Sequence, residues 1–91
     1  MLQLSHKKLD IYFQSMILVK QIYFVTKSFP EVEKFGLSNQ LRRAAVSVIS
    51  NISEGASRKS LIEKKRFYEI SRSSLVEIDT QIEVALMLEY V

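Results

Sequence analysis

The chain contains several side chains with reactive chemistry, but they lack the partners that catalysis requires. The sequence has no cysteine, so thiol nucleophiles and thiolate metal sites are excluded. Serines are plentiful, yet no base accompanies them at a spacing that would activate a hydroxyl. Two glycines cannot build a glycine-rich phosphate loop. The only histidine, His6, is expected to be an exposed N-terminal residue. We therefore predict a protein that is not an enzyme and has no cofactor or metal site.

Four acidic residues in the last third of the chain are the remaining candidates for acid–base work or metal binding. They are Glu69, Glu77, Asp79 and Glu83, and most of them lie off the apolar stripe of the expected helix. A di-metal helical bundle needs inward carboxylates together with Glu-x-x-His pairs, and His6 lies outside any such spacing. We interpret these acids as part of a solvated helix face.

One set of polar residues is less typical of a solvated face. Its members fall within about an 80° sector of the second expected helix and border the apolar stripe of that helix. That stripe comprises Leu41, Ala44, Ala45, Val48, Ile49 and Ile52. Solvent faces usually contain Lys and Glu, whereas this set includes amide and hydroxyl side chains. Such edge positions often form hydrogen-bonded networks with a neighbouring helix or subunit, and an ordinary solvent face is the alternative. This polar ladder consists of Gln40, Arg43, Ser47, Asn51 and Glu54.

Basic residues gather near the middle of the chain. Residues 36–60 include four basic side chains and one acid, while the whole chain has a net charge of +3 and a pI of about 9.3. Such a cluster favours phosphate contacts, but no aromatic residues interleave it, so base stacking is not supported. A solvated surface of mixed charge is the alternative. The candidate nucleic-acid contacts are Arg42, Arg58, Lys59, Lys64, Lys65 and Arg66.

The first helix is expected from about residue 7 to residue 28. One face has helical spacing, through Ile11, Tyr12, Leu18, Val19, Ile22 and Tyr23. A second apolar set points elsewhere, which favours an interface with another subunit, although a wide intramolecular core is the alternative. This candidate oligomer interface consists of Phe13, Met16, Ile17 and Phe24.

A connector is expected after this helix, because Pro30 disfavours helix and Gly36 adopts conformations closed to other residues. Two aromatic residues of the connector, Phe29 and Phe35, are expected to plug the end of the core.

The second helix is expected from Ser38, as the N-cap, to about Glu54, and Gly55 is expected to be the left-handed residue that ends it. A capping box of Ser60 and Glu63 then predicts the start of a third helix that runs to the C-terminal end. The core stripe of that helix comprises Phe67, Ile70, Ser71, Ser74, Leu75, Ile78, Ile82 and Ala85.

The short loop between the second and third helices predicts an antiparallel hairpin. We therefore expect residues 1–91 to form a single all-α domain, an up-down antiparallel helical bundle of three helices. The hairpin brings Arg43 near the third helix, and we predict a contact between Arg43 and Glu77.

The motifs of the chain closely resemble those of the four-helix-bundle family of 23S rRNA intervening-sequence proteins. The hallmark of that family is similar to the residues from Gln40 to Ser47 and from Asn51 to Gly55. The connector motifs Phe29-Pro30-Glu31 and Phe35-Gly36-Leu37, and the third-helix stretch from Arg66 to Glu77, extend the resemblance to about residues 9–90.

The resemblance implies a bacterial, cytosolic helical bundle that is often assembled as a ring-like homopentamer. It also implies a relation to accessory proteins of diversity-generating retroelements, which work beside a reverse transcriptase and bind nucleic acid through basic surfaces. No catalytic residues are implied, and the polar motif of the family corresponds to the polar ladder. Family members usually continue into a fourth helix after the equivalent of Glu89-Tyr90-Val91, so we expect a fourth helix to be missing, a groove to be open and the apolar side chains at the C-terminal end to be uncovered.

Two functions follow as hypotheses. The first is a self-assembling accessory protein that binds RNA or DNA through its basic residues. The second is a scaffold or accessory subunit that binds only proteins, such as a larger protein partner. No run approaches the ~20 apolar residues of a membrane span and no secretory signal is present, so we expect no membrane contact and a cytoplasmic location.

Overall fold

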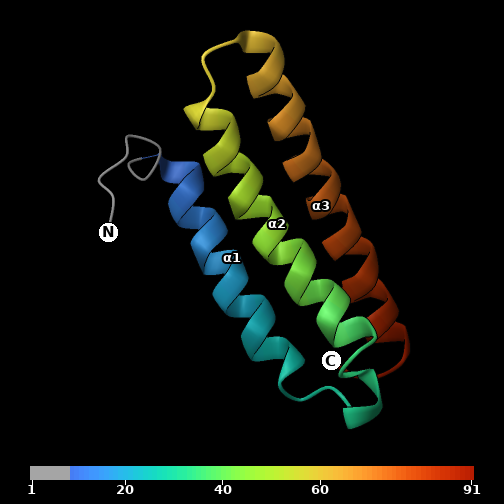
Figure 1. Ribbon diagram of the computed structural model, residues 1–91. Helices are drawn as coiled ribbons and strands as arrows, with labels where there is room; N and C mark the ends of the chain where they lie inside the picture. The colour runs from blue at the N-terminus through green and yellow to red at the C-terminus, as the bar shows by residue number, and fades with distance from the viewer. Residues whose placement is uncertain (1–8) are drawn as a thin grey trace.

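The computed structural model describes residues 9–91, which fold into three α-helices and one short turn of 3-10 helix. The elements are α1 (Asp10–Thr26), η2 (Glu31–Glu33), α2 (Leu37–Ser57) and α3 (Leu61–Met87). The helices run alternately down and up, with α2 between the other two (Figure 1). The all-α fold and the helical-bundle architecture predicted from the sequence are confirmed.

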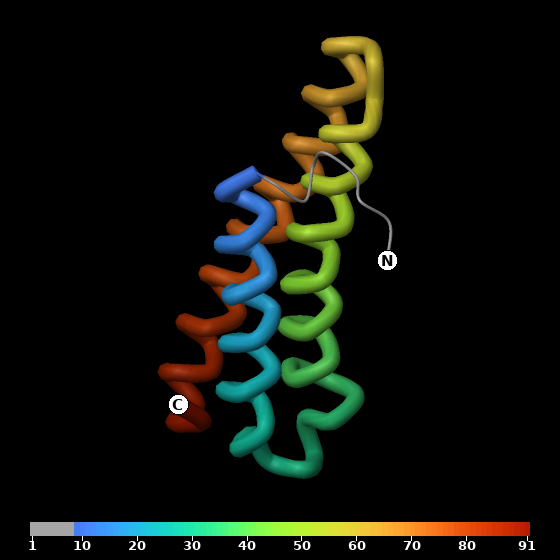
Figure 2. The backbone as a smooth tube through the Cα atoms, turned by 90° about the vertical axis from the view of Figure 1, so that its left-hand side faces the viewer, coloured from blue at the N-terminus to red at the C-terminus, as the bar shows by residue number. Residues whose placement is uncertain are grey.

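The central position of α2 leaves the bundle open on one side. Within the described residues, α1 and α3 each pack on α2 and not on each other. The hairpin of α2 and α3 also extends beyond the first turn of α1, so its end projects alone (Figure 2). No helix among residues 9–91 is long and apolar enough to span a bilayer.

The buried core lies along the face of α2 that carries the predicted apolar stripe. Leu41, Ala45 and Val48 are almost fully buried there, and Ile78 and Ala85 cover them from α3. Small residues at this face allow the helices to approach closely.

The start of α2 differs from the prediction. The helix begins at Leu37 after Gly36, and Ser38 is buried within the first turn, so Ser38 is not the N-cap. The free backbone N–H of Leu37 instead donates to the Glu33 carboxylate, at 3.0 Å from Oε1. A carboxylate at this position also complements the positive end of the helix dipole.

The prediction that Gly55 ends α2 is wrong. The helix continues to Ser57, and no glycine has a positive φ. Gly55 is buried instead, and a Cβ atom at this position would lie 2.6 Å from Cε1 of Tyr68. The glycine therefore lets the Tyr68 ring of α3 lie directly on the backbone of α2.

The capping signal before α3 is confirmed. Ser60 has extended backbone angles, and its hydroxyl oxygen accepts a hydrogen bond from the backbone N–H of Glu63 at 3.0 Å. From this cap α3 runs for 27 residues. On its predicted stripe Ser71, Ser74, Ile78 and Ala85 are buried, whereas Phe67, Ile70, Leu75 and Ile82 are more exposed.

The two faces of α1 have the orientation expected from their spacing. Ile22 is buried and Leu18 and Val19 pack against the core, whereas Ile11 and Tyr23 of the same predicted face are exposed. The candidate interface residues Phe13, Met16, Ile17 and Phe24 are all exposed. His6, Lys7 and Lys8 lie outside the described residues.

The connector and the C-terminal turn close the lower end of the bundle. Phe29 is buried and its ring centroid lies 5.4 Å from that of Tyr90, whereas Phe35 is 85% exposed, so only Phe29 plugs the core. The Tyr90 hydroxyl donates to Oε2 of Glu33 at 2.8 Å. Four apolar side chains of this end are exposed: Leu86, Met87, Leu88 and Val91.

We predict that Gly55→Ala destabilises the protein by about 1 kcal/mol, because the new methyl group displaces the Tyr68 ring. In a Tyr68→Ala background the same change should stabilise it by about 0.5–1 kcal/mol, because alanine favours helix over glycine. Urea unfolding of the four proteins measures both effects. An effect of the same sign in both backgrounds would show that the Tyr68 ring is not the reason for a glycine at position 55.

We predict that the Glu33–Tyr90 hydrogen bond makes the stability of the fold decrease at acidic pH. The Leu37 N–H and the Tyr90 hydroxyl lower the pKa of Glu33 below 4.5. A lowered native pKa means that this stabilisation is present above the unfolded value and is lost as the pH falls through the native one. The melting temperature should therefore fall more between pH 6 and pH 3 in the natural protein than in Glu33→Gln.

The matched control for this effect is Tyr90→Phe, which removes only the hydroxyl. Its Glu33 carboxyl, followed by NMR, should titrate closer to 4.5 than that of the natural protein. An unchanged titration midpoint in Tyr90→Phe would contradict the assignment.

Candidate functional site

The polar ladder of α2 lies along its contact with α3. Ser47 and Ser74 form a hydroxyl–hydroxyl hydrogen bond of 2.9 Å between the two helices. The Asn51 side-chain amide donates to the backbone oxygen of Ser47 at 2.8 Å and to its hydroxyl oxygen at 3.1 Å. The middle of the ladder is thus a network between neighbouring helices, in which each short side chain has a partner.

The lower part of the ladder opens into a polar cleft of about 380 Å³. The Gln81 amide of α3 donates to Oε1 of Gln40 at 3.2 Å and to Oε1 of Glu77 at 3.0 Å. Arg43 and Glu77 line this cleft together, but in the described structure they share neither a hydrogen bond nor an ion pair. The structure thus brings the two residues to one cleft, as the hairpin predicted, but the hydrogen-bond partner of Glu77 there is Gln81 rather than Arg43.

The upper end of the ladder adjoins the hairpin tip, by which we mean residues 57–66. Two cations of the tip have structural partners. Arg58 forms an ion pair of 3.1 Å with Glu54 and its guanidinium lies 4.9 Å from the centre of the Phe67 ring. The Lys64 ammonium donates to the backbone oxygens of Gly55 and Ala56, at 3.4 and 3.1 Å, and so satisfies carbonyl groups at the end of α2.

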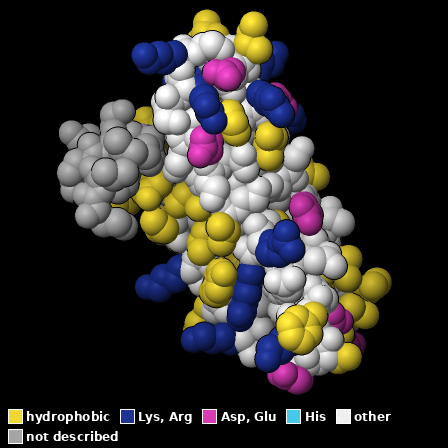
Figure 3. Space-filling model, viewed as in Figure 1, with side chains coloured by type: hydrophobic (Ala, Val, Ile, Leu, Met, Phe, Trp, Pro, Cys, Tyr) yellow, Lys and Arg dark blue, Asp and Glu magenta, His cyan; other side chains and the backbone are white. Residues whose placement is uncertain are grey.

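The other three cations of the tip are Lys59, Lys65 and Arg66, and all three are exposed. Two apolar residues at the same apex, Leu61 and Ile62, are 81% and 84% exposed. Figure 3 shows Lys and Arg side chains around this upper end of the molecule, with hydrophobic side chains at its apex. The tip thus presents a cationic surface that no other helix of residues 9–91 covers.

Arg42 does not belong to the hairpin tip. It precedes Arg58 by 16 residues on α2, which corresponds to about 24 Å along the helix. Its Nε donates to the Thr26 hydroxyl oxygen at 2.8 Å, and its guanidinium lies 4.7 Å from the centre of the Tyr23 ring. The grouping of Arg42 with the other basic residues is therefore wrong, and this arginine joins α2 to α1.

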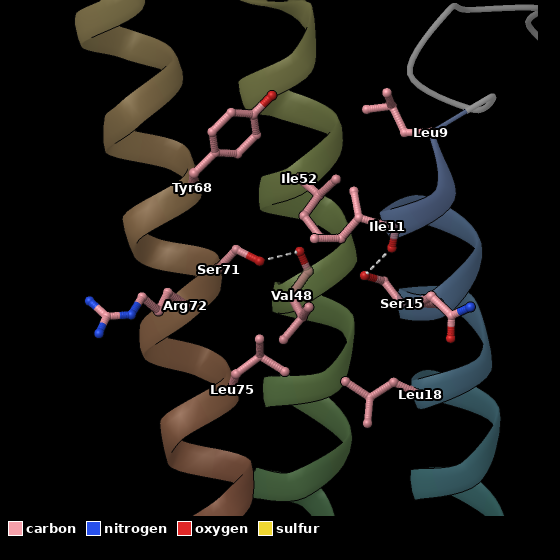
Figure 4. Close-up of a pocket in the computed structure, with 11 residues that line it drawn as sticks. Leu9, Ile11, Ser15, Leu18, Val48, Ile52, Tyr68, Ser71, Arg72 and Leu75 are labelled. Atoms are coloured by element: carbon pink, nitrogen blue, oxygen red, sulfur yellow. Dashed lines mark hydrogen bonds between the residues drawn. The ribbon is translucent and has the colours of Figure 1, made fainter.

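An apolar groove of about 490 Å³ runs between α1 and α3 (Figure 4). Ile52 and Val48 of α2 form its floor. The hydroxyls of the groove are satisfied internally, since Ser71 donates to the Val48 backbone oxygen at 2.9 Å and Ser15 to that of Ile11 at 2.7 Å. The residues that line the groove are Leu9, Ile11, Gln14, Ser15, Leu18, Val48, Ile52, Tyr68, Ser71, Arg72 and Leu75.

An open groove was expected from the resemblance, but the residues that line it were not. Leu18 and Leu75 were assigned only to core stripes, and Tyr68 was given no role. A signal was present in the spacing, because Ile11 and Leu18, like Tyr68 and Leu75, recur seven residues apart and so share one helix face.

Residues 9–91 contain no group of three or more His, Cys, Asp or Glu side chains that could hold a metal ion. The chemistry of the described surfaces therefore consists of exposed cations, a hydrogen-bonded ladder and apolar faces.

The fold and its polar ladder define an up-down helical-bundle protein built on an α2–α3 hairpin. The model of the 23S rRNA-intervening sequence protein family matches residues 7–91. The chain therefore belongs to the 23S rRNA-intervening sequence protein family, as its motifs led us to expect. None of the curated proteins compared with the chain matches it.

We predict that Arg42→Ala lowers the free energy of unfolding by about 1–2 kcal/mol, because it removes a charged hydrogen bond and a cation–π contact. The neighbouring Arg43→Ala is the matched control, since this arginine is exposed and is expected to change stability by no more than about 0.5 kcal/mol. Chemical unfolding of both variants checks the prediction. Equal effects of the two substitutions would contradict it.

Proposed function

We propose that the chain is a non-catalytic, self-assembling protein that binds RNA through its hairpin tip. The observation that supports this proposal is the group of exposed cations Lys59, Lys65 and Arg66 at the projecting end of the hairpin. Exposed Lys and Arg side chains neutralise phosphates and release counterions, which is the main source of affinity in binding that does not depend on sequence.

The charge balance of the tip favours an anionic partner. Residues 57–66 contain five basic side chains and one acid, Glu63. Arg58 and Lys64 are held by Glu54 and by backbone carbonyls, so their positions are fixed before a ligand arrives. The three exposed cations have no hydrogen bond or ion pair within the described residues, and they remain available for phosphate oxygens.

The tip supports phosphate contacts rather than base recognition. Phe67 lies under Arg58, and Tyr68 packs on Gly55, so both rings already have a packing partner within the hairpin. Three phosphate contacts to a single strand give a slope of about −2 in a plot of log affinity against log salt. Binding is therefore expected to be weak for one copy, tolerant of sequence and sensitive to salt.

Self-assembly is proposed from the exposed apolar side chains of α1. Contiguous apolar patches on a small protein usually mark contacts with other proteins. The resemblance to a family that often forms ring-like homopentamers supports an assembly, which would place several tips on one particle and raise their avidity. A cytoplasmic location, and a relation to the accessory proteins of diversity-generating retroelements, belong to the same proposal.

We predict that replacing the three exposed cations, in Lys59→Gln/Lys65→Gln/Arg66→Gln, weakens RNA binding at least tenfold at low salt. The reason is the loss of about three phosphate contacts, which also lowers the salt slope by about 2. Fluorescence anisotropy with a labelled 20-nucleotide RNA, between about 50 and 300 mM salt, measures both quantities.

The control is Lys34→Gln/Arg43→Gln/Arg72→Gln, which makes the same change in net charge at exposed residues outside the tip. Both triple variants must show the natural molecular mass by light scattering. Equal losses in the two variants would indicate a general charge effect and contradict the tip as the site. Absence of RNA binding by the natural protein at any salt would leave the alternative function, a scaffold that binds only proteins.

A further inference from the structure

We propose that a cleft at the lower end of the molecule binds the phosphate group of a small phosphate ester. This cleft, which we call the connector cleft, has a volume of about 420 Å³ and is lined by the end of α1, the connector and the start of α2. The connector and the hairpin tip lie at opposite ends of the bundle (Figure 1), so the cleft is a site separate from the proposed RNA contact.

The guanidinium of Arg42 is held beside the connector cleft with its terminal nitrogens free. Its Nε donates to the Thr26 hydroxyl oxygen at 2.8 Å, and the Tyr23 ring lies 4.7 Å from its central carbon, so the plane of the group is fixed. The terminal nitrogens Nη1 and Nη2 have no hydrogen bond or ion pair within the described residues. A guanidinium of fixed plane is a preferred partner of phosphate, because it can donate two parallel hydrogen bonds.

A buried hydroxyl without a partner lies one helical turn before this arginine. Ser38 is 7% exposed and lines the connector cleft, and its hydroxyl forms no hydrogen bond within residues 9–91. Buried polar groups nearly always have a partner, since desolvation without one costs free energy. The unpaired hydroxyl of Ser38 therefore points to a ligand in the cleft that accepts a hydrogen bond from it.

The start of α2 supplies further donors to the same cleft. The first N–H groups of a helix have no partner within the helix, and those of Leu37 and Gln40 already donate to acceptors of the connector. The N–H groups of Ser38 and Asn39 have no such acceptor within the described residues. They lie at the positive end of the helix dipole, which favours an anion.

The charges of the connector cleft favour an anion as well. Its lining includes the three cations Lys27, Lys34 and Arg42 and one acid, Glu31, which gives a net charge of +2. The Lys34 ammonium lies 5.6 Å from the centre of the Phe35 ring, whereas Lys27 is exposed and has no ion pair within residues 9–91. Figure 3 shows several Lys and Arg side chains on the lower half of the molecule.

The carbonyl groups at the end of α1 are already bonded. A helix C-terminus is its negative end and would repel an anion nearby. Here the backbone N–H groups of residues 27–29 donate to the oxygens of residues 24–26, and the Thr26 hydroxyl donates to the Ile22 oxygen at 2.7 Å. The repulsion is thereby reduced, while the donors of α2 remain free.

This set of donors suits a phosphate monoester. Such a group has a charge of about −1.5 to −2 at pH 7 and three acceptor oxygens, which match the arginine fork, the Ser38 hydroxyl and the free N–H groups. The connector cleft is larger than one anion, and its walls include Pro30 and the exposed ring of Phe35, so the organic part of the ester has room. The same group occurs on a free sugar phosphate and at the end of an RNA.

NMR titration of the full-length, ¹⁵N-labelled protein tests the site. The probes are inorganic phosphate, ribose 5-phosphate and ribose, at a pH of about 7.5, where the phosphate is mostly a dianion. Both phosphate probes should shift the amide signals of Ser38 and Asn39, ribose should not, and ribose 5-phosphate should bind more tightly than inorganic phosphate. Equal affinities for the two phosphate probes would overturn the assignment to an ester.

Three variants separate binding from stability. Arg42→Gln should weaken ribose 5-phosphate about tenfold, but it also changes the contact with α1. Ser38→Ala removes a hydroxyl that has no partner in the described structure, so it should weaken binding about threefold without lowering the free energy of unfolding. Glu31→Gln should tighten binding about twofold, because it removes a negative charge from the cleft. Unchanged affinity in both Ser38→Ala and Glu31→Gln would overturn the site.

Two lysines of α1 provide a matched pair. Lys27 lines the connector cleft, whereas Lys20, two turns earlier and equally exposed in class, does not. Lys27→Gln should weaken ribose 5-phosphate about threefold, and Lys20→Gln should leave its affinity unchanged. Equal losses in the two variants would show a general charge effect and overturn the assignment.

The source of the phosphate is identified in the hairpin-tip variant Lys59→Gln/Lys65→Gln/Arg66→Gln, in which the proposed RNA contact is removed. A 5′-phosphorylated RNA that shifts the two amides at lower concentration than ribose 5-phosphate, while a 5′-hydroxyl RNA does not, identifies an RNA end. The reverse order identifies a free ester, and both results support the site. Absence of any shift of the Ser38 and Asn39 amides with all phosphate probes overturns the inference and leaves the RNA proposal for the hairpin tip unaffected.

Discussion

The structure depends on the packing of α2 against both of its neighbours. The most deeply buried side chains of this helix are Leu41, Ala45 and Val48. The outer helices α1 and α3 each pack on α2 and do not pack on each other. The side chains on the surface of α2 therefore set how closely α1 and α3 approach it. At Gly55 there is no side chain, and the Tyr68 ring of α3 lies on the backbone of α2. The same arrangement places the polar ladder along α3, projects the hairpin tip and leaves the groove open.

Most of the fold was predictable because helical periodicity and capping are local. The apolar stripe of α2 and the Ser60 cap lie within a few residues of the structure that they specify, and both were assigned correctly. The errors concern contacts between segments far apart in sequence. A glycine at position 55 could either end a helix or make room for an aromatic ring, and the local sequence is the same in both cases. The ring belongs to Tyr68, on the next helix. Ser38 is a good capping residue by type, but the helix already begins at Leu37. The free backbone N–H of Leu37 is bonded by the carboxylate of Glu33.

The candidate surfaces were less predictable, since proximity along the chain does not fix the partner of a charge. Arg42 and Arg43 are adjacent, yet a helix turns by 100° between them, so one reaches Thr26 on α1 and the other faces the polar cleft. Arg58 and Lys64 belong to the basic tip in sequence, and their cations are nonetheless occupied by Glu54 and by carbonyl oxygens. Burial of Phe29 but not of Phe35 has the same origin, because only Phe29 meets the returning Tyr90.

The hydrogen bond between Tyr90 and Glu33 joins residues 57 positions apart, and it gives the molecule two mechanically different ends. At the lower end, the connector, the start of α2 and the C-terminal turn are tied together. At the upper end, no third helix of the described residues lies beside the hairpin (Figure 2). The free energy of local opening should therefore decrease from the lower end toward the upper end, so the upper ends of α2 and α3 should separate more readily than the lower ends. Binding of a ligand at the upper end would then carry the entropy cost of ordering these helix ends. A partner that fills the groove would order them beforehand and so reduce that cost.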